Sequence, residues 1–218
     1  TGTASGLALE SDGIDADSFV IAYDQPDSFA APRVWWTFRS FGHHRVAVLD
    51  GGLAAWMAAG LPVTDAPPRI FPASFPARFE PRSVRSAEEI AGLLGTATEQ
   101  IIDARPPGRY AGRDPEPRPT AKSGHVPGAV SLPFLSLVDT GRHGAWRTAA
   151  ELEAAFAAAG IDPQKPSTAY CGSGVTACSI AFGAHLLGSD AVAVYDGSWA
   201  EWGNRDDLPV VAGETPGR

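Results

Sequence analysis

The sequence predicts an α/β fold, in which a mainly parallel sheet is flanked by helices, and it predicts that this fold occurs twice in tandem. Two observations lead to this prediction. Short apolar runs typical of buried strands alternate with segments that carry helix start and stop signals. The chain also repeats parts of its own sequence at a nearly constant spacing. Because parallel sheets bind ligands beyond the carboxyl ends of their strands, the loops at those ends are the first places to search for a site.

The internal repeat has an offset of 146 or 147 residues. Residues 13–15 (GID) recur at 160–162, and residues 46–51 (VAVLDG) recur as VAVYDG at 192–197. A tryptophan and a Leu-Pro-Val segment of the first copy also recur, in the same order, in the second copy. We therefore interpret the chain as two copies of one domain.

The domain limits follow from the repeat. We expect a partial first domain at 1–66, a linker at 67–82 and a complete second domain at 83–218. Five prolines fall between residues 67 and 81, and they favour an extended, stiff connection. The first half of the second copy, about 83–147, has no counterpart upstream, so we expect the first domain to lack about 65 residues on its N-terminal side.

Composition excludes several classes of protein. The net charge of −8 does not suit nucleic acid or an anionic membrane surface, so neither is an expected partner. No run of 18 apolar residues is present, and two cysteines cannot make a disulfide scaffold. We predict a cytoplasmic location.

The first elements of the second copy are a helix, a strand and a loop. Ser86 and Glu89 form a capping box before a short helix that ends near Gly95. Residues 100–104 (QIIDA) are typical of a buried strand. The Pro-, Gly- and Arg-rich segment 105–124 is then a long loop, and such loops are usually functional.

The later elements continue the alternation of strand and helix. Thr148 and Glu151 form a second capping box, and Gly160 ends the helix that follows. The remaining predicted elements are short strands at 130–132, 168–170 and 191–195, a helix at 174–187, and a short helix from 198 to about 203.

Cys171 is the candidate nucleophile. It follows the strand at 168–170, and the glycines at 172 and 174 let the backbone curl so that successive N–H groups point inward. The start of the next helix adds partial positive charge. Both effects favour a thiolate, and the hydroxyls of Ser173 and Thr176 can donate to the sulfur or to a bound anion.

The two cysteines are open to other interpretations. Cys171 could be a buried structural cysteine, although two neighbouring glycines are poor core filler. A tyrosine-phosphatase-type loop needs an arginine six residues after the cysteine, where this chain has Ala177. Cys178 lies too far along the helix for a disulfide with Cys171, and we expect it to pack in the core.

Four segments together resemble the rhodanese-type sulfurtransferases. They are CGSGVTA at 171–177, GHVPGA at 124–129, DAR at 103–105 and DGSW at 196–199. The resemblance covers essentially the whole chain, including a tandem arrangement in which only the C-terminal copy keeps the cysteine. Asp24 occupies the matching position in the first copy.

The resemblance is greatest to the 3-mercaptopyruvate sulfurtransferase branch. Gly172 and Ser173 carry this resemblance, because the thiosulfate branch typically has Arg-Lys there. It implies sulfur transfer from 3-mercaptopyruvate through a Cys171 persulfide, with release of pyruvate. The implied acceptor is a thiol, such as thioredoxin or a low-molecular-weight thiol, or cyanide. No metal or organic cofactor is implied. The alternatives are a thiosulfate:cyanide sulfurtransferase and a non-catalytic sulfur-carrier or interaction module.

Arg109 and Arg118 in the long loop are the candidate donor-binding cations. Guanidinium groups bind carboxylates in a bidentate manner, although loop arginines are usually just solvated. The resemblance implies that both hold the substrate, and Arg113 is a weaker candidate. It also implies that Ser173 is catalytic, with a candidate role as proton relay, and that the remaining loop residues contact the substrate: Gly172, Gly174, Val175 and Thr176.

Other conspicuous side chains are expected to be structural. We expect Arg105 to be tied to the end of its strand and His125 to shape a turn. Asp50 and Asp196 match each other in the two copies, which favours a turn over catalysis. We expect two histidines to be solvated, His43 and His44. We expect three tryptophans to pack in the core or between the domains: Trp35, Trp36 and Trp56.

Overall fold

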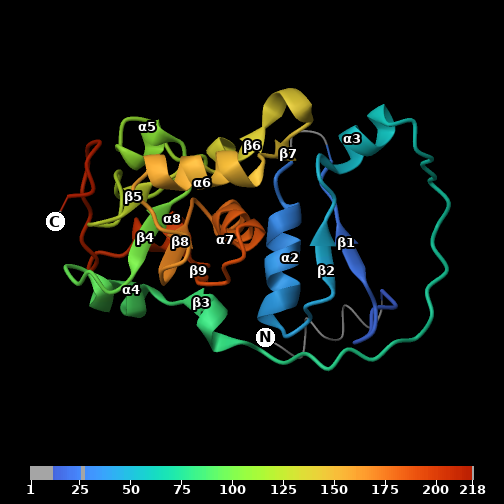
Figure 1. Ribbon diagram of the computed structural model, residues 1–218. Coiled ribbons are helices and arrows are strands. Elements are labelled where there is room, and N and C mark those ends of the chain that lie inside the picture. The colour runs from blue at the N-terminus through green and yellow to red at the C-terminus, as the bar shows by residue number, and fades with distance from the viewer. Residues whose placement is uncertain (1–11, 26–27, 218) are drawn as a thin grey trace. The chain divides into compact units, whose positions relative to one another are not determined.

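The computed structural model describes residues 12–25 and 28–217 (Figure 1). The chain forms two compact units. Unit 1 comprises Thr1–Pro81 with Gly141–Ala145, and unit 2 comprises Arg82–Thr140 with Trp146–Arg218. None of the helices formed by the described residues is long and apolar enough to cross a membrane.

Unit 1 contains a two-stranded parallel sheet and two helices. Strand β1 (Val20–Ala22) pairs with β2 (Val46–Val48), and Val20 lies opposite Val46. Helix α2 (Ala31–Ser40) begins with a proline in its first turn, where a missing N–H costs nothing, and α3 is Gly52–Ala58. Helix α2 buries Trp35 and Trp36, and Trp56 of α3 donates its indole N–H to the Pro62 carbonyl at 2.9 Å. The predicted packing of Trp35 and Trp36 is confirmed, whereas Trp56 is only half-buried.

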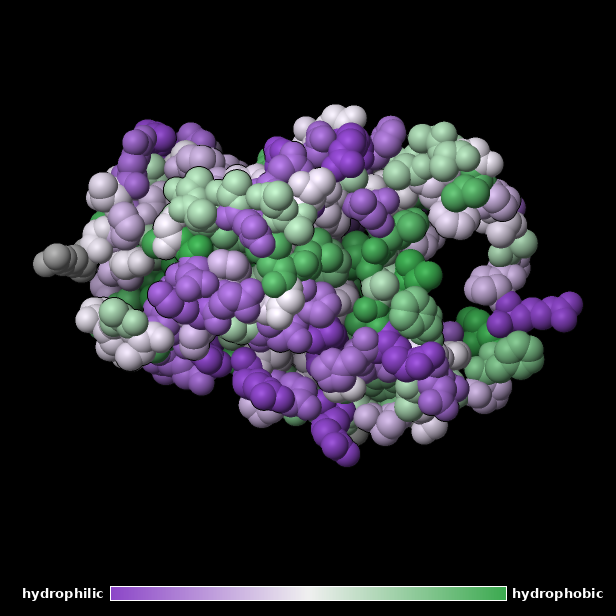
Figure 2. Space-filling model, in the orientation of Figure 1, coloured by the Kyte–Doolittle hydropathy of each residue, from purple (hydrophilic) through white to green (hydrophobic). Residues whose placement is uncertain are grey.

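One face of β1 is exposed. Phe19, Ile21 and Tyr23 alternate along the strand and are each more than half exposed. Figure 2 shows hydrophobic residues at the surface in the region of this sheet. The repeat aligns β1 and β2 with two adjacent strands of unit 2, where Thr168 and Tyr170, the counterparts of Ile21 and Tyr23, are buried.

The Pro-rich stretch packs against unit 1 in its second half. The backbone N–H of Arg78 donates to the Phe41 carbonyl at 3.0 Å, and that of Glu80 donates to Ser40 at 2.8 Å. Phe75 is buried, and its ring centroid lies 5.4 Å from that of His43. His43 is itself 5% exposed, so the prediction of a solvated side chain is wrong. Aromatic neighbours bury this imidazole, whereas the adjacent His44 is exposed as predicted.

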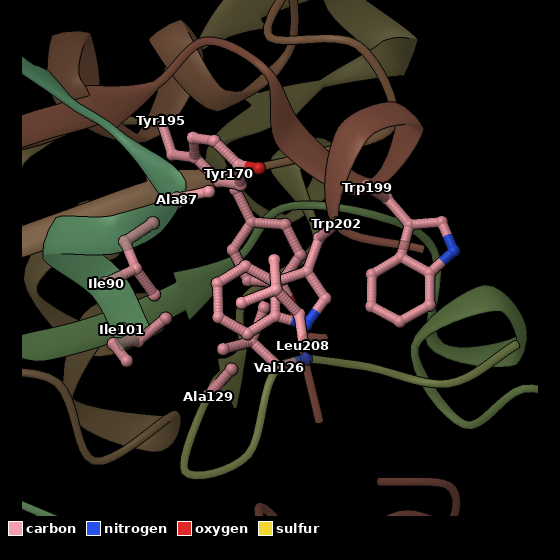
Figure 3. Packing of buried hydrophobic residues seen from close by; sticks show 10 residues of the cluster. All are labelled: Ala87, Ile90, Ile101, Val126, Ala129, Tyr170, Tyr195, Trp199, Trp202 and Leu208. Atoms are coloured by element: carbon pink, nitrogen blue, oxygen red, sulfur yellow. The ribbon is translucent and has the colours of Figure 1, made fainter. Parts of the chain in front are cut away.

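Unit 2 is built on a five-stranded sheet in the order β3-β9-β8-β4-β5, and all its described pairs are parallel. Helix α7 packs on β8 and β9. Side chains of α4 and α8 join Tyr170 and Tyr195 in one buried cluster (Figure 3). The predicted α/β architecture with a mainly parallel sheet is thereby confirmed. The strands are β3 (Val84–Arg85), β4 (Gln100–Asp103), β5 (Val130–Ser131), β8 (Ser167–Tyr170) and β9 (Val192–Tyr195).

Local start signals place two helices of unit 2 correctly. Ser86 caps α4 (Ala87–Leu93) and Thr148 caps α6 (Ala149–Ala158), and both capping boxes are complete. Helix α7 (Ala177–Leu186) begins three residues later than predicted, because Gly174 has a φ of +79° and interrupts the helical backbone.

Several short elements were not predicted. One lies in the long loop: the one-turn helix α5 (Pro107–Tyr110). The others are 3₁₀ turns η1 (Pro81–Ser83), η2 (Phe134–Leu137) and η3 (Thr140–Arg142), with strands β6 (Val138–Asp139) and β7 (Ala145–Trp146). The last helix, α8 (Ser198–Trp202), was predicted and begins at the expected residue.

Candidate functional site

Cys171 lies at the carboxyl end of the central part of the unit 2 sheet. It directly follows β8, which is hydrogen-bonded to β4 on one side and β9 on the other. The residue is 2% exposed. Because all three strands are parallel, their carboxyl ends meet at one edge, and the loops that follow them surround the cysteine.

The start of α8 holds the cysteine in place through both of its backbone groups. The N–H of Cys171 donates to Ser198 Oγ at 3.1 Å, and that hydroxyl donates to the Tyr195 carbonyl at 2.8 Å. The N–H of Trp199 donates to the Cys171 carbonyl at 2.9 Å, and the N–H of Ala200 donates to Gly172 at 2.9 Å. The sequence interpretation of 196–199 as a structural turn did not identify Ser198 as an anchor of the cysteine.

The loop at 171–176 presents backbone donors without acceptors. Within the described residues, the N–H groups of Gly172, Ser173, Val175 and Thr176 donate to no other residue. Thr176 is the N-cap of α7, and its side chain makes no capping hydrogen bond. A run of such donors before a helix is a favourable place for an anion.

Cys178 has the core role predicted for it. Its side chain is fully buried, and its thiol donates to the Gly174 carbonyl at 3.3 Å. Both cysteines of the chain are free thiols. The two therefore differ in surroundings, although both are buried: one sits in a loop with unused donors and the other in a helix.

A pocket of about 210 Å³ adjoins the cysteine loop. Four predicted site residues line it, namely Arg109, Arg118, Gly172 and Ser173. The other four predicted residues, Cys171, Gly174, Val175 and Thr176, belong to the same loop as Gly172 but are not among the lining residues. The pocket is completed by residues that the sequence interpretation did not select: Glu116, Pro117, Thr120 and Ala200.

The two pocket arginines have different surroundings. Arg109, in α5, donates from Nη1 to a Glu116 carboxylate oxygen at 3.2 Å. Arg118 is exposed, and it makes no ion pair or hydrogen bond with residues 12–25 or 28–217. Arg113 pairs with Glu214 at 2.6 Å and is not among the lining residues. All the donors of Arg118 are therefore available to a ligand.

Arg105 is buried inside unit 2. Its guanidinium donates to both carboxylate oxygens of Asp103 and to the Gly124 carbonyl, and it lies 4.3 Å from the ring centroid of Trp199, a residue labelled in Figure 3. Burial by itself would lower the pKa of Arg105. The charge and hydrogen bonds of Asp103 outweigh that effect and raise the pKa, so the side chain stays charged. The predicted tie to the strand end is confirmed.

His125 is fixed inside the fold. Its Nδ1 lies 2.9 Å from the Tyr110 carbonyl oxygen, its Nε2 lies 3.1 Å from that of Thr215, and its ring stacks on Tyr110 at 3.8 Å. Its backbone exchanges two hydrogen bonds with Val211. This geometry agrees with a structural role.

Comparison with known proteins identifies one family. The model of the rhodanese-like domain matches residues 4–59 and 86–205. The chain is 42% identical to human 3-mercaptopyruvate sulfurtransferase over 192 residues, which is 87% of this chain and 64% of the human protein. It is 44% identical to bovine thiosulfate sulfurtransferase over 196 residues, which is 88% of this chain and 65% of the bovine protein.

A solved structure gives the same picture. The crystal structure of SseA from Escherichia coli, described as a 3-mercaptopyruvate sulfotransferase with the rhodanese fold, superposes with a TM-score of 0.78 and 35% identity. The superposition covers 90% of this chain and 72% of that chain. The present chain thus spans less than two thirds of the length of the human and bovine relatives.

Proposed function

The chain belongs to the family of rhodanese-like domains, and from that premise we propose that it is a sulfurtransferase that acts on 3-mercaptopyruvate. Sulfur passes through a Cys171 persulfide to a thiol or to cyanide, and pyruvate is released. One observation carries the proposal: a cysteine loop with four unused backbone donors adjoins a pocket that contains two arginines.

The pocket suits the charge of the proposed donor. Among the described residues nothing occupies the donors of Arg118, and Arg109 shares one nitrogen with Glu116. 3-Mercaptopyruvate offers a carboxylate and a keto oxygen, and guanidinium groups bind both through charge-assisted hydrogen bonds. The residues next to the cysteine, Gly172 and Ser173, are uncharged, so the binding charge comes from the arginines.

The chemical step is a displacement at sulfur. The Cys171 thiolate attacks the thiol sulfur of the donor, an S–S bond forms, and the C–S bond breaks. The bonding electrons leave with the carbon as the enolate of pyruvate. The proton that began on the donor's thiol ends on that carbon, so persulfide and pyruvate form without another reactant. Ser173 is the proposed relay for this proton.

The loop donors stabilise the charge that this step moves. The N–H groups of Gly172, Val175 and Thr176, with Gly174 shaping the turn between them, favour the anionic persulfide. The arginines stabilise the enolate oxygen. A thiol then attacks the outer sulfur, takes it as a new persulfide, and returns the Cys171 thiol. Cyanide instead leaves as thiocyanate.

The acceptor and the cellular setting remain predictions. We propose thioredoxin or a low-molecular-weight thiol as acceptor and a cytoplasmic location, which co-purification and fractionation test. The domain limits inferred from the repeat, 1–66, 67–82 and 83–218, are proposed in the same way.

A thiosulfate:cyanide sulfurtransferase is the second candidate, because the bovine relative of that name is 44% identical. The two candidates separate in a comparison of kcat/KM for thiosulfate and 3-mercaptopyruvate. The neutral residues Gly172 and Ser173 favour 3-mercaptopyruvate. A large preference for thiosulfate would replace the first candidate with the second.

The direct test uses the two cysteines as a matched pair. After exposure to 3-mercaptopyruvate, mass spectrometry of the unsubstituted chain and of Cys178→Ala is expected to show one added sulfur on Cys171, with pyruvate released. Cys171→Ser is expected to show neither. Absence of both products in the unsubstituted chain would favour a non-catalytic sulfur-carrier or interaction module, and full activity in Cys171→Ser would refute both enzyme candidates.

A further inference from the structure

Glu116 lies between the buried guanidinium of Arg105 and the pocket that adjoins the cysteine loop. One of its carboxylate oxygens accepts from Arg105 Nη1 at 2.8 Å, and the other accepts from Arg109 Nη1 at 3.2 Å. The Glu116 side chain is 8% exposed, yet the residue lines the pocket. A nearly buried carboxylate with each oxygen on a different guanidinium fixes the distance between those two groups.

The Arg105 end of this bridge is rigid. Arg105 is 1% exposed, and its Nε and Nη2 groups donate to Asp103 and to the Gly124 carbonyl. Asp103 is the last residue of β4, a strand paired on both sides. The position of the Glu116 carboxylate is therefore determined by the sheet.

The Arg109 end depends on this bridge for its orientation. Arg109 lies in a one-turn helix, its side chain is 21% exposed, and Glu116 is the partner of its guanidinium. An unrestrained arginine loses up to about 2 kcal/mol of side-chain entropy when a ligand fixes it. A carboxylate that fixes the guanidinium beforehand removes part of that cost from binding.

The bridge also places Arg109 beside the cysteine loop. A Cβ built on Gly172 would lie 3.6 Å from both Arg109 Nη1 and a Glu116 carboxylate oxygen. Gly172 is the residue after Cys171, so the ion pair packs against the backbone that follows the nucleophile. A shift of the pair would move a binding cation relative to Cys171.

We propose that Glu116 is a positioning residue, which holds Arg109 in the orientation that binds the donor. This inference rests on the proposed function, since it assigns Glu116 a role in the same pocket. It predicts that loss of the bridge weakens binding of a carboxylate ligand, so that KM rises by a larger factor than kcat falls. A merely structural carboxylate, which only compensates the charge of Arg105, would change stability instead.

The first experiment measures binding without turnover. Pyruvate is the probe, and its protection of Cys171 against alkylation by iodoacetamide gives a half-protecting concentration. In Glu116→Gln this concentration is expected to rise roughly ten-fold, equivalent to about 1.4 kcal/mol. Glu214→Gln is the control, because it breaks an exposed Arg–Glu pair outside the pocket and is expected to change nothing.

A second variant separates the effect on pyruvate binding from an effect on folding. Glu116→Asp keeps the charge beside Arg105 but is one methylene too short to reach both guanidinium groups. It is expected to unfold at the temperature of the unsubstituted chain and still to bind pyruvate more weakly. Equal protection in Glu116→Asp, Glu116→Gln and the unsubstituted chain overturns the proposal.

A double-mutant cycle identifies Arg109 as the intermediary. Arg109→Ala is expected to raise KM, and Glu116→Gln is expected to add almost nothing in that background. Additive effects would contradict the proposal. The outcome stays separate from the proposed function: no pyruvate protection and no persulfide in the unsubstituted chain overturn both, whereas protection that ignores Glu116 overturns only its positioning role.

Discussion

The loops after β1 and after β8 occupy matching places in the two copies. They differ in whether a side chain of the loop accepts from the backbone N–H groups at or before the start of the following helix. In unit 1, Asp24 Oδ1 accepts from the N–H groups of Ala30 and Ala31, at 2.7 and 2.9 Å, as α2 begins. In unit 2 the matching residue is Cys171, and the N–H groups of Gly172, Ser173, Val175 and Thr176 have no acceptor among the described residues. The first loop contains its own anion, and the second leaves the donors for a ligand.

The contacts that support the two loops match more closely. The N–H of Leu53 donates to the Asp24 carbonyl at 2.9 Å, as the N–H of Trp199 donates to that of Cys171 at 2.9 Å. The preceding residue has a positive φ in both, +58° at Gly52 and +52° at Ser198. The scaffold is therefore shared, and the chemistry differs through the side chains placed on it.

Cys171→Asp converts the second loop into the chemistry of the first, and it is the largest effect that we expect. The variant lacks a nucleophile, so sulfur transfer falls by roughly a thousand-fold or more. Its carboxylate supplies the acceptor that the loop lacks. We therefore expect Cys171→Asp to be more stable than Cys171→Ser by about 1 kcal/mol in chemical denaturation.

The comparison with Cys171→Ser isolates the anion from the loss of sulfur. Both variants are inactive, and both change a buried side chain at the same position. If the aspartate variant were equally stable or less stable, the loop donors would not form an anion site, and the contrast with Asp24 would fail.

Asp24→Ala tests the first loop. Removal of the carboxylate leaves the N–H groups of Ala30 and Ala31 and the hydroxyl of Ser28 without their acceptor. We expect a loss of about 1–2 kcal/mol in the stability of unit 1, the cost of removing a helix cap. Hydrogen exchange at residues 30 and 31 gives the local readout, and Asp65→Ala, at an exposed carboxylate, is the control. Unchanged exchange at those amides would show that Asp24 does not act as a cap.

Local signals account for the parts of this structure that the sequence predicted. Ser86 and Thr148 cap their helices through residues three positions away, and short apolar runs mark the positions of the strands. Cys171 was found from local signals too, because two glycines and a helix start follow it directly, whereas the family resemblance gave the two arginines their roles. Glu116 was missed because its partners lie 7 and 11 residues away in an irregular loop, where no periodicity applies. His43 was misjudged because aromatic residues from two segments bury it.

Ser198→Gly gives the smallest effect, because two contributions oppose each other. Glycine relieves the positive φ, worth about 1 kcal/mol, and loses the hydroxyl that accepts from the Cys171 N–H, worth about the same. We expect almost unchanged stability and a several-fold lower kcat, since the backbone of the nucleophile is less well held. Ser198→Ala keeps the strain and loses the hydroxyl, so it should be destabilised by about 1 kcal/mol relative to Ser198→Gly in the same denaturation experiment. Equal stability of the two variants would mean that the backbone conformation at residue 198 is unstrained. A side chain at this position would then be tolerated whether or not it bonds to the cysteine.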